Sequence, residues 1–192
     1  LSPEKLGHFL KVHTAQHKNG FTYHRQTGLR IKALVAVHLF GHPADMDPLA
    51  EMCSKANIIL IEDAAESLGS AYKGEQTGGI GKVGCFSFNG NKIITCGGGG
   101  MVVTDDEGVA NKIRHLSTQA KLKGMEYDHD EIGFNYRLSN IHASLGLAQL
   151  EQLANYIDIK RRNALFYKTL LEKQDIEFLW EQTYVKSNFW FY

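Results

Sequence analysis

The sequence has no excess of charge of either sign, because 21 lysine and arginine residues balance 21 aspartate and glutamate residues. Nucleic acids and anionic membranes attract proteins through a field of one sign, so neither is an expected partner. The apolar runs, such as Ala33–Val37 and Ile58–Ile61, are far too short to cross a bilayer. Residues 1–10 include Glu4 and His8, where a signal peptide requires an apolar core. We therefore expect a cytoplasmic protein.

The chain is also poor in cysteine. Cys53, Cys85 and Cys96 are odd in number and have neither the spacing of a metal site nor that of a redox pair. Reduced thiols in a cytosolic protein explain them most simply. His38 and His42 are four residues apart, but the glycine and the proline beside them break the helix that would align them as ligands. We expect no metal site.

The 192 residues suffice for one sizeable core, and a hydrophobic fraction of 43% is ordinary for a globular protein. Apolar, β-branched runs alternate with helical patterns along the first 120 residues. This alternation predicts an α/β fold with a mostly parallel sheet and active groups at the carboxyl ends of its strands. The expected strands are Ile31–His38, Asn57–Glu62, Val83–Asn89 and Met101–Thr104, and the expected helices include Met46–Ala56 and a segment ending near Gln119.

The two ends of the chain give further predictions. Serine and proline at positions 2 and 3 are a helix start, and that helix is expected to run to about His17. Turn signals around 21–24 predict a small hairpin. Apolar residues recur at helical spacing from Leu138 to Lys173, which fits one long helix or two with a bend. We expect strands of a second domain at 177–180 and from Phe189 onward.

A literal G-x-G-x-x-G occurs at Gly79–Gly84. In a dinucleotide-binding fold this motif follows a strand and opens a helix. Here it follows the polar loop 73–78 and precedes a strand. We therefore reject it as a nucleotide fingerprint and keep an NAD-binding oxidoreductase only as an alternative.

Lys92 is the most informative residue. It follows the β-prone run 83–89 and stands five residues before the tract Gly97–Gly100. Most lysines simply face solvent. A lysine desolvated in such a setting loses its proton easily and can form a Schiff base with a carbonyl.

Asp63, Ser87 and Asn135 support this interpretation. Asp63 closes a buried strand, where it can cap a helix or pair with a protonated ring nitrogen. The small residues Ala64 and Ala65 that follow it would let a flat ring approach the backbone. Ser87 can bond to backbone or bind a phosphate, and Asn135 offers amide donors that suit an anion.

These pieces in this order resemble the DegT/DnrJ/StrS family of pyridoxal phosphate (PLP)-dependent aminotransferases, which act on nucleotide-linked keto sugars. The matching stretches are 37–47, 62–69, 86–95, 97–100 and 133–137. Phe88-Asn89-Gly90-Asn91-Lys92 and Asp128–Glu131 are most similar to members of the legionaminic acid type, which make a UDP-linked 4-amino sugar. The resemblance implies the aspartate aminotransferase-like fold, type I of the PLP-dependent transferases.

The resemblance also implies residue roles. Lys92 is expected to form the internal aldimine with the cofactor, and Asp63 to pair with its pyridine nitrogen. Ser87 is expected to bind the phosphate, and Asn135 to reach the phosphate in the neighbouring subunit of a homodimer. The remaining positions that the resemblance assigns are Ala65 and Glu66 at the cofactor ring and Asn89, His129, Tyr136 and Arg137 at the substrate.

The function implied is a ping-pong transamination of a nucleotide-linked 4-keto-6-deoxy sugar to the 4-amino sugar, with L-glutamate as donor. An inactive regulatory protein of the same fold is a further alternative, against which Lys92 and Asp63 argue. By the same resemblance, residues 1–150 belong to the large PLP-binding domain without its N-terminal portion. Residues 151–173 form an inter-domain helix, and 174–192 begin a truncated C-terminal domain.

Overall fold

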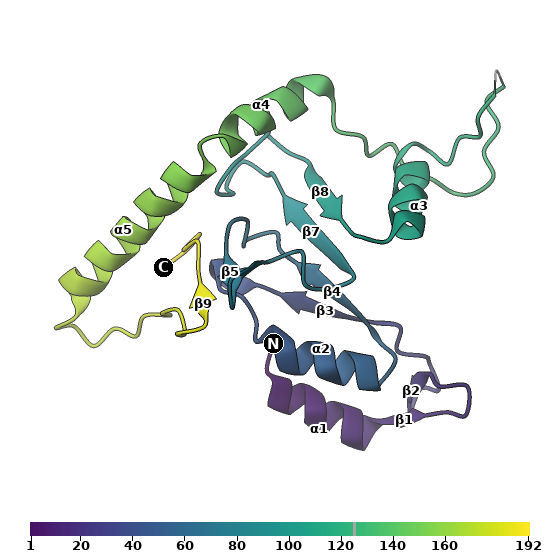
Figure 1. Cartoon of the computed structure of the whole chain (residues 1–192), viewed down its shortest axis with the longest axis horizontal. Coiled ribbons are helices and arrows are strands. Elements are labelled where there is room, and N and C mark those ends of the chain that lie inside the picture. The colour runs from purple at the N-terminus through teal and green to yellow at the C-terminus, as the bar shows by residue number, and fades with distance from the viewer. Residues whose placement is uncertain (125) are drawn as a thin grey trace.

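The computed structural model describes residues 1–124 and 126–192. Its central sheet has four strands in the order β3-β4-β7-β8 (Figure 1). The first three are parallel, and β8 is antiparallel to β7. The prediction of a mostly parallel α/β sheet is therefore confirmed. The strands are β3 (Ala33–Val37), β4 (Ile59–Asp63), β7 (Val83–Ser87) and β8 (Gly100–Val103).

Two helices cover one face of this sheet. They are α1 (Pro3–His13) and α2 (Met46–Lys55), which lie side by side beneath the strands in Figure 1. The core forms where α2 packs on β3 and β4, through Met46 and Leu49 of the helix and Ala36 and Leu60 of the strands. Leu6 of α1 joins the same cluster. Burial of these apolar side chains is the main force that holds the helices on the sheet.

Helix α1 is shorter than predicted. It ends at His13 because Thr14 adopts extended dihedral angles (φ −126°, ψ 163°) and its hydroxyl donates to the Leu10 carbonyl at 2.6 Å. The chain then forms the predicted hairpin, in which β1 (Thr14–Gln16) pairs with β2 (Thr22–His24). The sequence pattern predicts a helix to about residue 17. Residues 14–16 instead pair as a strand with residues 22–24.

The opposite face of the sheet is largely open among the described residues. Val35 is 51% exposed and Ile59 is 49% exposed. Strand side chains alternate between faces, so these residues point away from α1 and α2. The apolar runs predicted strands buried on both faces. In the described structure helices cover only one of them.

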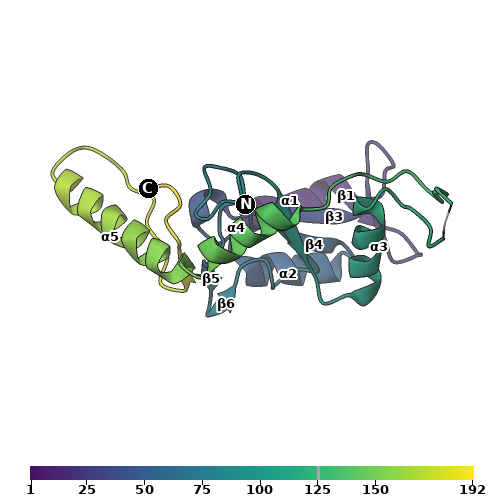
Figure 2. The ribbon, with the colours of Figure 1, turned by 90° about the horizontal axis from the view of Figure 1, so that it is seen from above.

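Helices α3 (Glu107–Ser117), α4 (Asn140–Leu150) and α5 (Leu153–Leu171) follow β8. The apolar pattern of 138–173 allowed one helix or two, and the structure has two, separated at Glu151–Gln152. Figure 2 shows α4 along the sheet and α5 projecting beyond its end. None of the described helices is long and apolar enough to cross a membrane.

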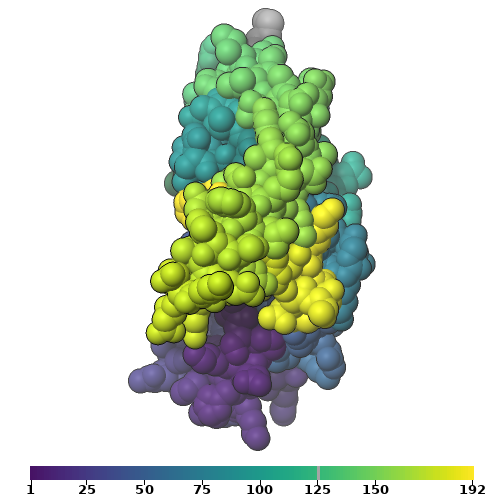
Figure 3. Space-filling model, turned by 90° about the vertical axis from the view of Figure 1, so that its left-hand side faces the viewer, coloured from purple at the N-terminus to yellow at the C-terminus, as the bar shows by residue number. Residues whose placement is uncertain are grey.

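The strands predicted at 177–180 and from Phe189 onward are wrong. Among residues 172–192, all of which the structure describes, the one strand is β9 (Val185–Lys186), which pairs with β5 (Ala71–Tyr72). Strand β5 also pairs with β6 (Glu75–Gln76). Phe189 has a φ of 49°, which is incompatible with a strand. The segment after β9 packs beside α5 (Figure 3).

Candidate functional site

Lys92 lies in the loop between β7 and β8, and its backbone amide donates to the Asn89 carbonyl at 3.0 Å. Its side chain is only 13% exposed. The Nζ atom is 3.6 Å from Glu66 Oε1 and 4.0 Å from the centroid of the Trp190 ring. The lysine is therefore confined between a carboxylate and an aromatic face, unlike an ordinary surface lysine.

Glu66 is itself held in place. Its Oε2 atom accepts a hydrogen bond of 2.7 Å from the Phe40 amide. Phe40 belongs to a short 3-10 turn, Leu39–Gly41, and has a left-handed φ of 57°. Such a conformation is uncommon for a residue other than glycine and is found mainly where surrounding structure enforces it. One carboxylate oxygen of Glu66 thus fixes the loop after β3, and the other faces Lys92.

Asp63 and Ala65 form the turn at the carboxyl end of β4. Asp63 Oδ1 accepts a hydrogen bond from the Ala65 amide at 3.1 Å, an Asx-type turn. In the sheet register Asp63 pairs with Cys85 of β7. Burial, and then the charge of Asp63, raise the pKa of the Cys85 thiol, which keeps it neutral. Ser87 follows two residues later on β7 and so lies on the same face of the sheet as Asp63.

Ser87 and Asn89 are in the turn that leads to Lys92. The Ser87 hydroxyl accepts a long hydrogen bond of 3.4 Å from the Asn89 amide. The Asn89 side chain donates to Asn91 Oδ1 at 3.2 Å. Five of the predicted positions therefore lie at the carboxyl ends of β4 and β7 or in the loops that follow these strands, as Lys92 does. They are Asp63, Ala65, Glu66, Ser87 and Asn89.

Glu62 belongs to the opposite face of β4. It is fully buried and accepts a hydrogen bond from His38 Nε2 at 3.0 Å. The amides of Gly78, Ile80 and Gly81 also donate to it, at 2.8, 2.7 and 2.6 Å. The glycine-rich loop thus encloses an acid of the chain itself, which agrees with its rejection as a dinucleotide site.

The remaining predicted residues lie elsewhere. Tyr136 and Arg137 line a hollow of about 540 Å³ with the glycines 98–100. Lys92 and Trp190 line another pocket, of about 300 Å³. Asn135 forms a β-bridge with Thr118 after α3. His129 hydrogen-bonds through Nδ1 to the Gln119 carbonyl at 2.7 Å. Within one chain, Tyr136 and Arg137 therefore line a different pocket from Lys92, and Asn135 and His129 bond to the segment that follows α3.

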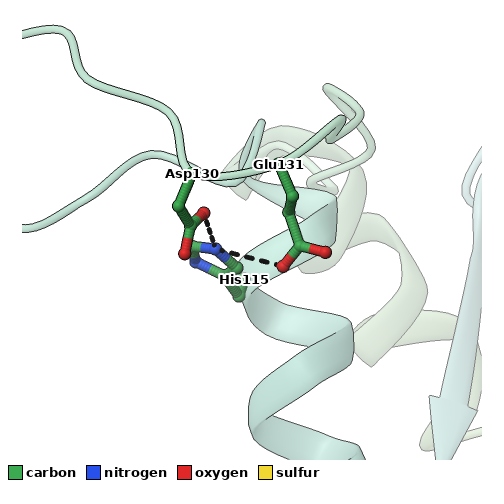
Figure 4. Close-up of side chains that lie close together, drawn as sticks. All are labelled: His115, Asp130 and Glu131. Carbon is green, nitrogen blue, oxygen red and sulfur yellow. Dashed lines mark hydrogen bonds and ion pairs between the residues drawn. The ribbon is translucent and has the colours of Figure 1, made fainter.

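A cluster of His115, Asp130 and Glu131 was not anticipated (Figure 4). His115 Nε2 is 2.6 Å from Asp130 Oδ1 and 3.5 Å from Glu131 Oε1. The hydrogen bond from His115 holds the pKa of Asp130 below its usual range. Glu131 also pairs with Lys112 of α3. These ion pairs fasten the loop after α3 to the helix that precedes it.

The sequence reasoning also missed Trp190 and Asn188. The Trp190 indole lies beside a residue 98 positions earlier in the chain (190 − 92), so no local pattern could indicate the contact. The nearest signal is the aromatic run at 189–192, whose composition predicts a strand.

The comparisons with known proteins agree on one family. A model described as the DegT/DnrJ/EryC1/StrS aminotransferase family matches residues 22–192. GDP-perosamine synthase of Escherichia coli O157:H7 is 48% identical over 139 residues, which cover 72% of this chain and 38% of that protein. EpsN of Bacillus subtilis (strain 168) is 47% identical over 167 residues, or 86% of this chain and 43% of that protein.

A comparison with solved structures identifies the same family. The crystal structure of a DegT DnrJ EryC1 StrS aminotransferase from Brucella abortus matches with a TM-score of 0.85 and 26% identity. The match covers 99% of this chain and 48% of that one. The chain therefore spans less than half the length of these relatives, and the expected fold is confirmed over that span.

Proposed function

The chain belongs to the DegT/DnrJ/EryC1/StrS family of PLP-dependent aminotransferases, and from this premise we propose that the protein aminates a nucleotide-linked keto sugar. The observation that carries the proposal is the Lys92 amine, which is confined between Glu66 and Trp190 close to the carboxyl ends of β4 and β7. The finer proposal is a ping-pong reaction with L-glutamate as amino donor and a 4-keto-6-deoxy sugar as acceptor.

The residues around Lys92 fit the cofactor of this family. Lys92 would hold it covalently, Asp63 would pair with its ring nitrogen, and the Ser87 hydroxyl would bind its phosphate. Asp63 and Ser87 share one face of the sheet, and Ala65, whose amide donates to Asp63, has a small side chain that leaves space for a ring. Glu66 would lie at the edge of that ring. When bound, PLP supplies an electron sink for the carbanion formed at the amino donor.

The chain's own groups supply the proton transfers. Once released from the cofactor, the Lys92 amine is the group positioned to remove a proton from the donor carbon and to return one later. A negatively charged Asp63 favours the protonated form of the ring nitrogen. Glu66, which is already anchored to the Phe40 amide, restricts where the lysine amine can move.

We propose a homodimer in which Asn135 of one subunit completes the site of its neighbour, with Tyr136 and Arg137 near the substrate. Two features support this arrangement. Tyr136 and Arg137 line a different pocket from the one that Lys92 lines in its own chain. Large apolar side chains beside it are exposed, with Tyr136 at 77% and Ile141 at 83%. Apolar surface of this kind is characteristic of protein interfaces. His129 and Asn89 remain proposed substrate contacts.

The nucleotide is the least constrained part of the proposal. The stretches that include Asn89 and His129 resemble the legionaminic acid type, which predicts a UDP-linked sugar. The relative in Escherichia coli is named for a GDP-linked product. Amination of carbon 4 with either nucleotide is our proposal, and UDP-linked and GDP-linked 4-keto-6-deoxy sugars are the two substrates to compare.

The alternatives have weaker support. An NAD-binding oxidoreductase would need the amides of the Gly79–Gly84 loop for a pyrophosphate. Two of those amides, of Ile80 and Gly81, already donate to Glu62. An inactive regulatory protein would have no need of a half-buried lysine beside Glu66.

The test is an absorbance spectrum of the intact protein with PLP, before and after addition of L-glutamate. We expect a visible band from the lysine-bound cofactor that L-glutamate removes. Lys92→Ala should lose both the band and amination of the keto sugar. Lys73→Ala, which removes a lysine that is 51% exposed, is the matched control and should keep both. A Lys92→Ala protein that retained the band and turnover would refute the proposal.

A further inference from the structure

Trp190 covers one side of the Lys92 amine. The lysine Nζ atom is 4.0 Å from the centroid of the indole ring, and Trp190 is only 5% exposed. An ammonium group over the face of tryptophan is attracted by the electron density of the ring. The ring also excludes water from that side, whatever the charge of the amine. On another side the amine meets Glu66 Oε1 at 3.6 Å.

The indole ring is fixed in its orientation. Its Nε1–H group donates a hydrogen bond of 2.7 Å to the carbonyl of Asn91, the residue directly before Lys92. The Trp190 carbonyl accepts a hydrogen bond from Lys160 of α5 at 3.1 Å. Phe191 stacks on the indole with the ring centroids 4.0 Å apart. The ring is therefore tied to the loop that carries the lysine as well as to α5.

Asn188 connects the two groups that flank the amine. It is fully buried, and its Oδ1 atom accepts a hydrogen bond from the Trp190 amide at 2.9 Å. Its Nδ2 group donates to the carbonyls of Glu66 and Leu68 at 2.9 and 3.0 Å. One side chain thus sets the position of Trp190 relative to Glu66.

We propose that Trp190 is a positioning residue for Lys92. Its indole face forms a wall that confines the amine to the side of Glu66, so that a carbonyl compound reaches the nitrogen from the side that the ring leaves free. The effect of this wall on how the Lys92 amine binds PLP rests on the proposed function. The contact itself does not depend on that function and can be tested separately.

The first test measures access to the amine in the intact protein freed of PLP. The protein is treated with a small acetylating reagent, and the rate of acetylation at Lys92 is followed by peptide mass spectrometry. Trp190→Ala should raise this rate about fivefold or more, because the ring no longer covers or attracts the amine. Trp190→Phe keeps an aromatic face, although it loses the hydrogen bond to Asn91, and should stay within about twofold of wild type.

Trp180 provides the matched control. It stacks on Phe189 of the same segment, with the ring centroids 4.9 Å apart, and Lys168 rather than Lys92 lies over its ring. Trp180→Ala therefore disturbs the packing of the segment without uncovering Lys92. Circular dichroism and thermal unfolding establish that each variant is folded. An unchanged rate in Trp190→Ala, or an equal rise in Trp180→Ala, would overturn the proposal.

The second test measures loading of PLP by absorbance. We expect Trp190→Ala to bind PLP about tenfold more weakly than wild type, which is about 1.4 kcal/mol, and Trp190→Phe to recover most of that loss. Wild-type protein that binds no PLP would refute the proposed function, while the acetylation rates still decide the role of Trp190. Wild-type and Trp190→Ala proteins that load PLP equally well would refute the positioning role alone.

Discussion

His38 Nε2 donates a hydrogen bond of 3.0 Å to Glu62 Oε2, and both side chains are fully buried. The Ala44 amide donates to His38 Nδ1 at 3.0 Å, so that nitrogen is an acceptor and the proton resides on Nε2. A histidine ring that carries its one proton on Nε2 therefore satisfies both hydrogen bonds. This pair, with the loop amides on Glu62, joins β3, β4 and the loop before β7. It holds together the strands that carry Asp63 and Ser87 on their other face.

Replacement of Glu62 by glutamine should be strongly destabilising. The carboxylate accepts four hydrogen bonds, and an amide group would place its N–H donors against other donors. We expect a loss of about 3 kcal/mol in the free energy of unfolding, measured by urea denaturation. Glu51→Gln, at an exposed carboxylate of α2, should leave the urea midpoint unchanged. A Glu62→Gln protein as stable as wild type would refute this role.

The same carboxylate should make stability depend on pH. Burial alone raises the pKa of Glu62, but hydrogen bonds from His38 and two loop amides outweigh it, so the pKa lies below the ordinary 4.5. A carboxyl group whose pKa is lower in the folded state stabilises the fold above its unfolded value and loses that contribution as the pH falls through the folded value. The difference in stability between wild type and Glu62→Gln should therefore be constant above about pH 5 and shrink below pH 4.5. Urea titrations at pH 6 and pH 3.5 test this, and a difference that does not shrink would contradict it.

Arg161 should control the order of the C-terminal segment. Its guanidinium donates two hydrogen bonds to Glu181, at 2.8 and 2.7 Å, and a third to the Ser187 carbonyl at 2.6 Å. The single ammonium group of a lysine cannot reproduce this two-pronged hydrogen bonding of the planar guanidinium. We expect Arg161→Lys to speed amide hydrogen exchange in 185–190 about tenfold. Arg162→Lys changes an exposed neighbour on α5 and should leave the exchange unaffected. Equal exchange in both variants would mean that this ion pair does not anchor the segment.

Gly41 should be sensitive to alanine for two separable reasons. It has a φ of +86°, and an added Cβ atom would lie 1.9 Å from Asn188 Oδ1. Gly74 has a similar φ of +90° but open space around the added atom. Gly74→Ala therefore measures how much free energy of unfolding is lost by placing alanine at a positive φ, which is about 1 kcal/mol. Gly41→Ala adds the clash and should cost about 3 kcal/mol in the free energy of unfolding. Equal costs for the two variants would show that Asn188 moves aside freely.

Local sequence signals predicted much of the fold. Apolar runs located all four strands of the central sheet to within a few residues, and the helix signals located α2, α3 and the α4–α5 pair. The extended strands at the C-terminus were wrong because the aromatic run 189–192 has strand composition, yet its backbone groups bond to side chains of Asn188 and Ser187. Composition cannot distinguish a strand from a segment whose amides are satisfied in another way.

The candidate site was predictable only in part. The family resemblance pointed to Lys92, Asp63 and Ser87, and local spacing put each at a strand end or in the loop that follows. The buried cluster on Glu62 has no local signal in the sequence, because the amides that donate to this carboxylate lie sixteen to nineteen residues further along the chain. The contact of Lys92 with Trp190 had no local signal at all.

The amino-acid sequence by itself determined the alternation of strands and helices and the positions of the chemically distinctive residues, because periodicity and turn chemistry act over a few neighbouring positions. Only the tertiary structure decided which acid faces the core and which faces Lys92, and which aromatic ring covers the amine. Those outcomes depend on strand register and on the path of a chain that returns after almost a hundred residues, and no local preference encodes either.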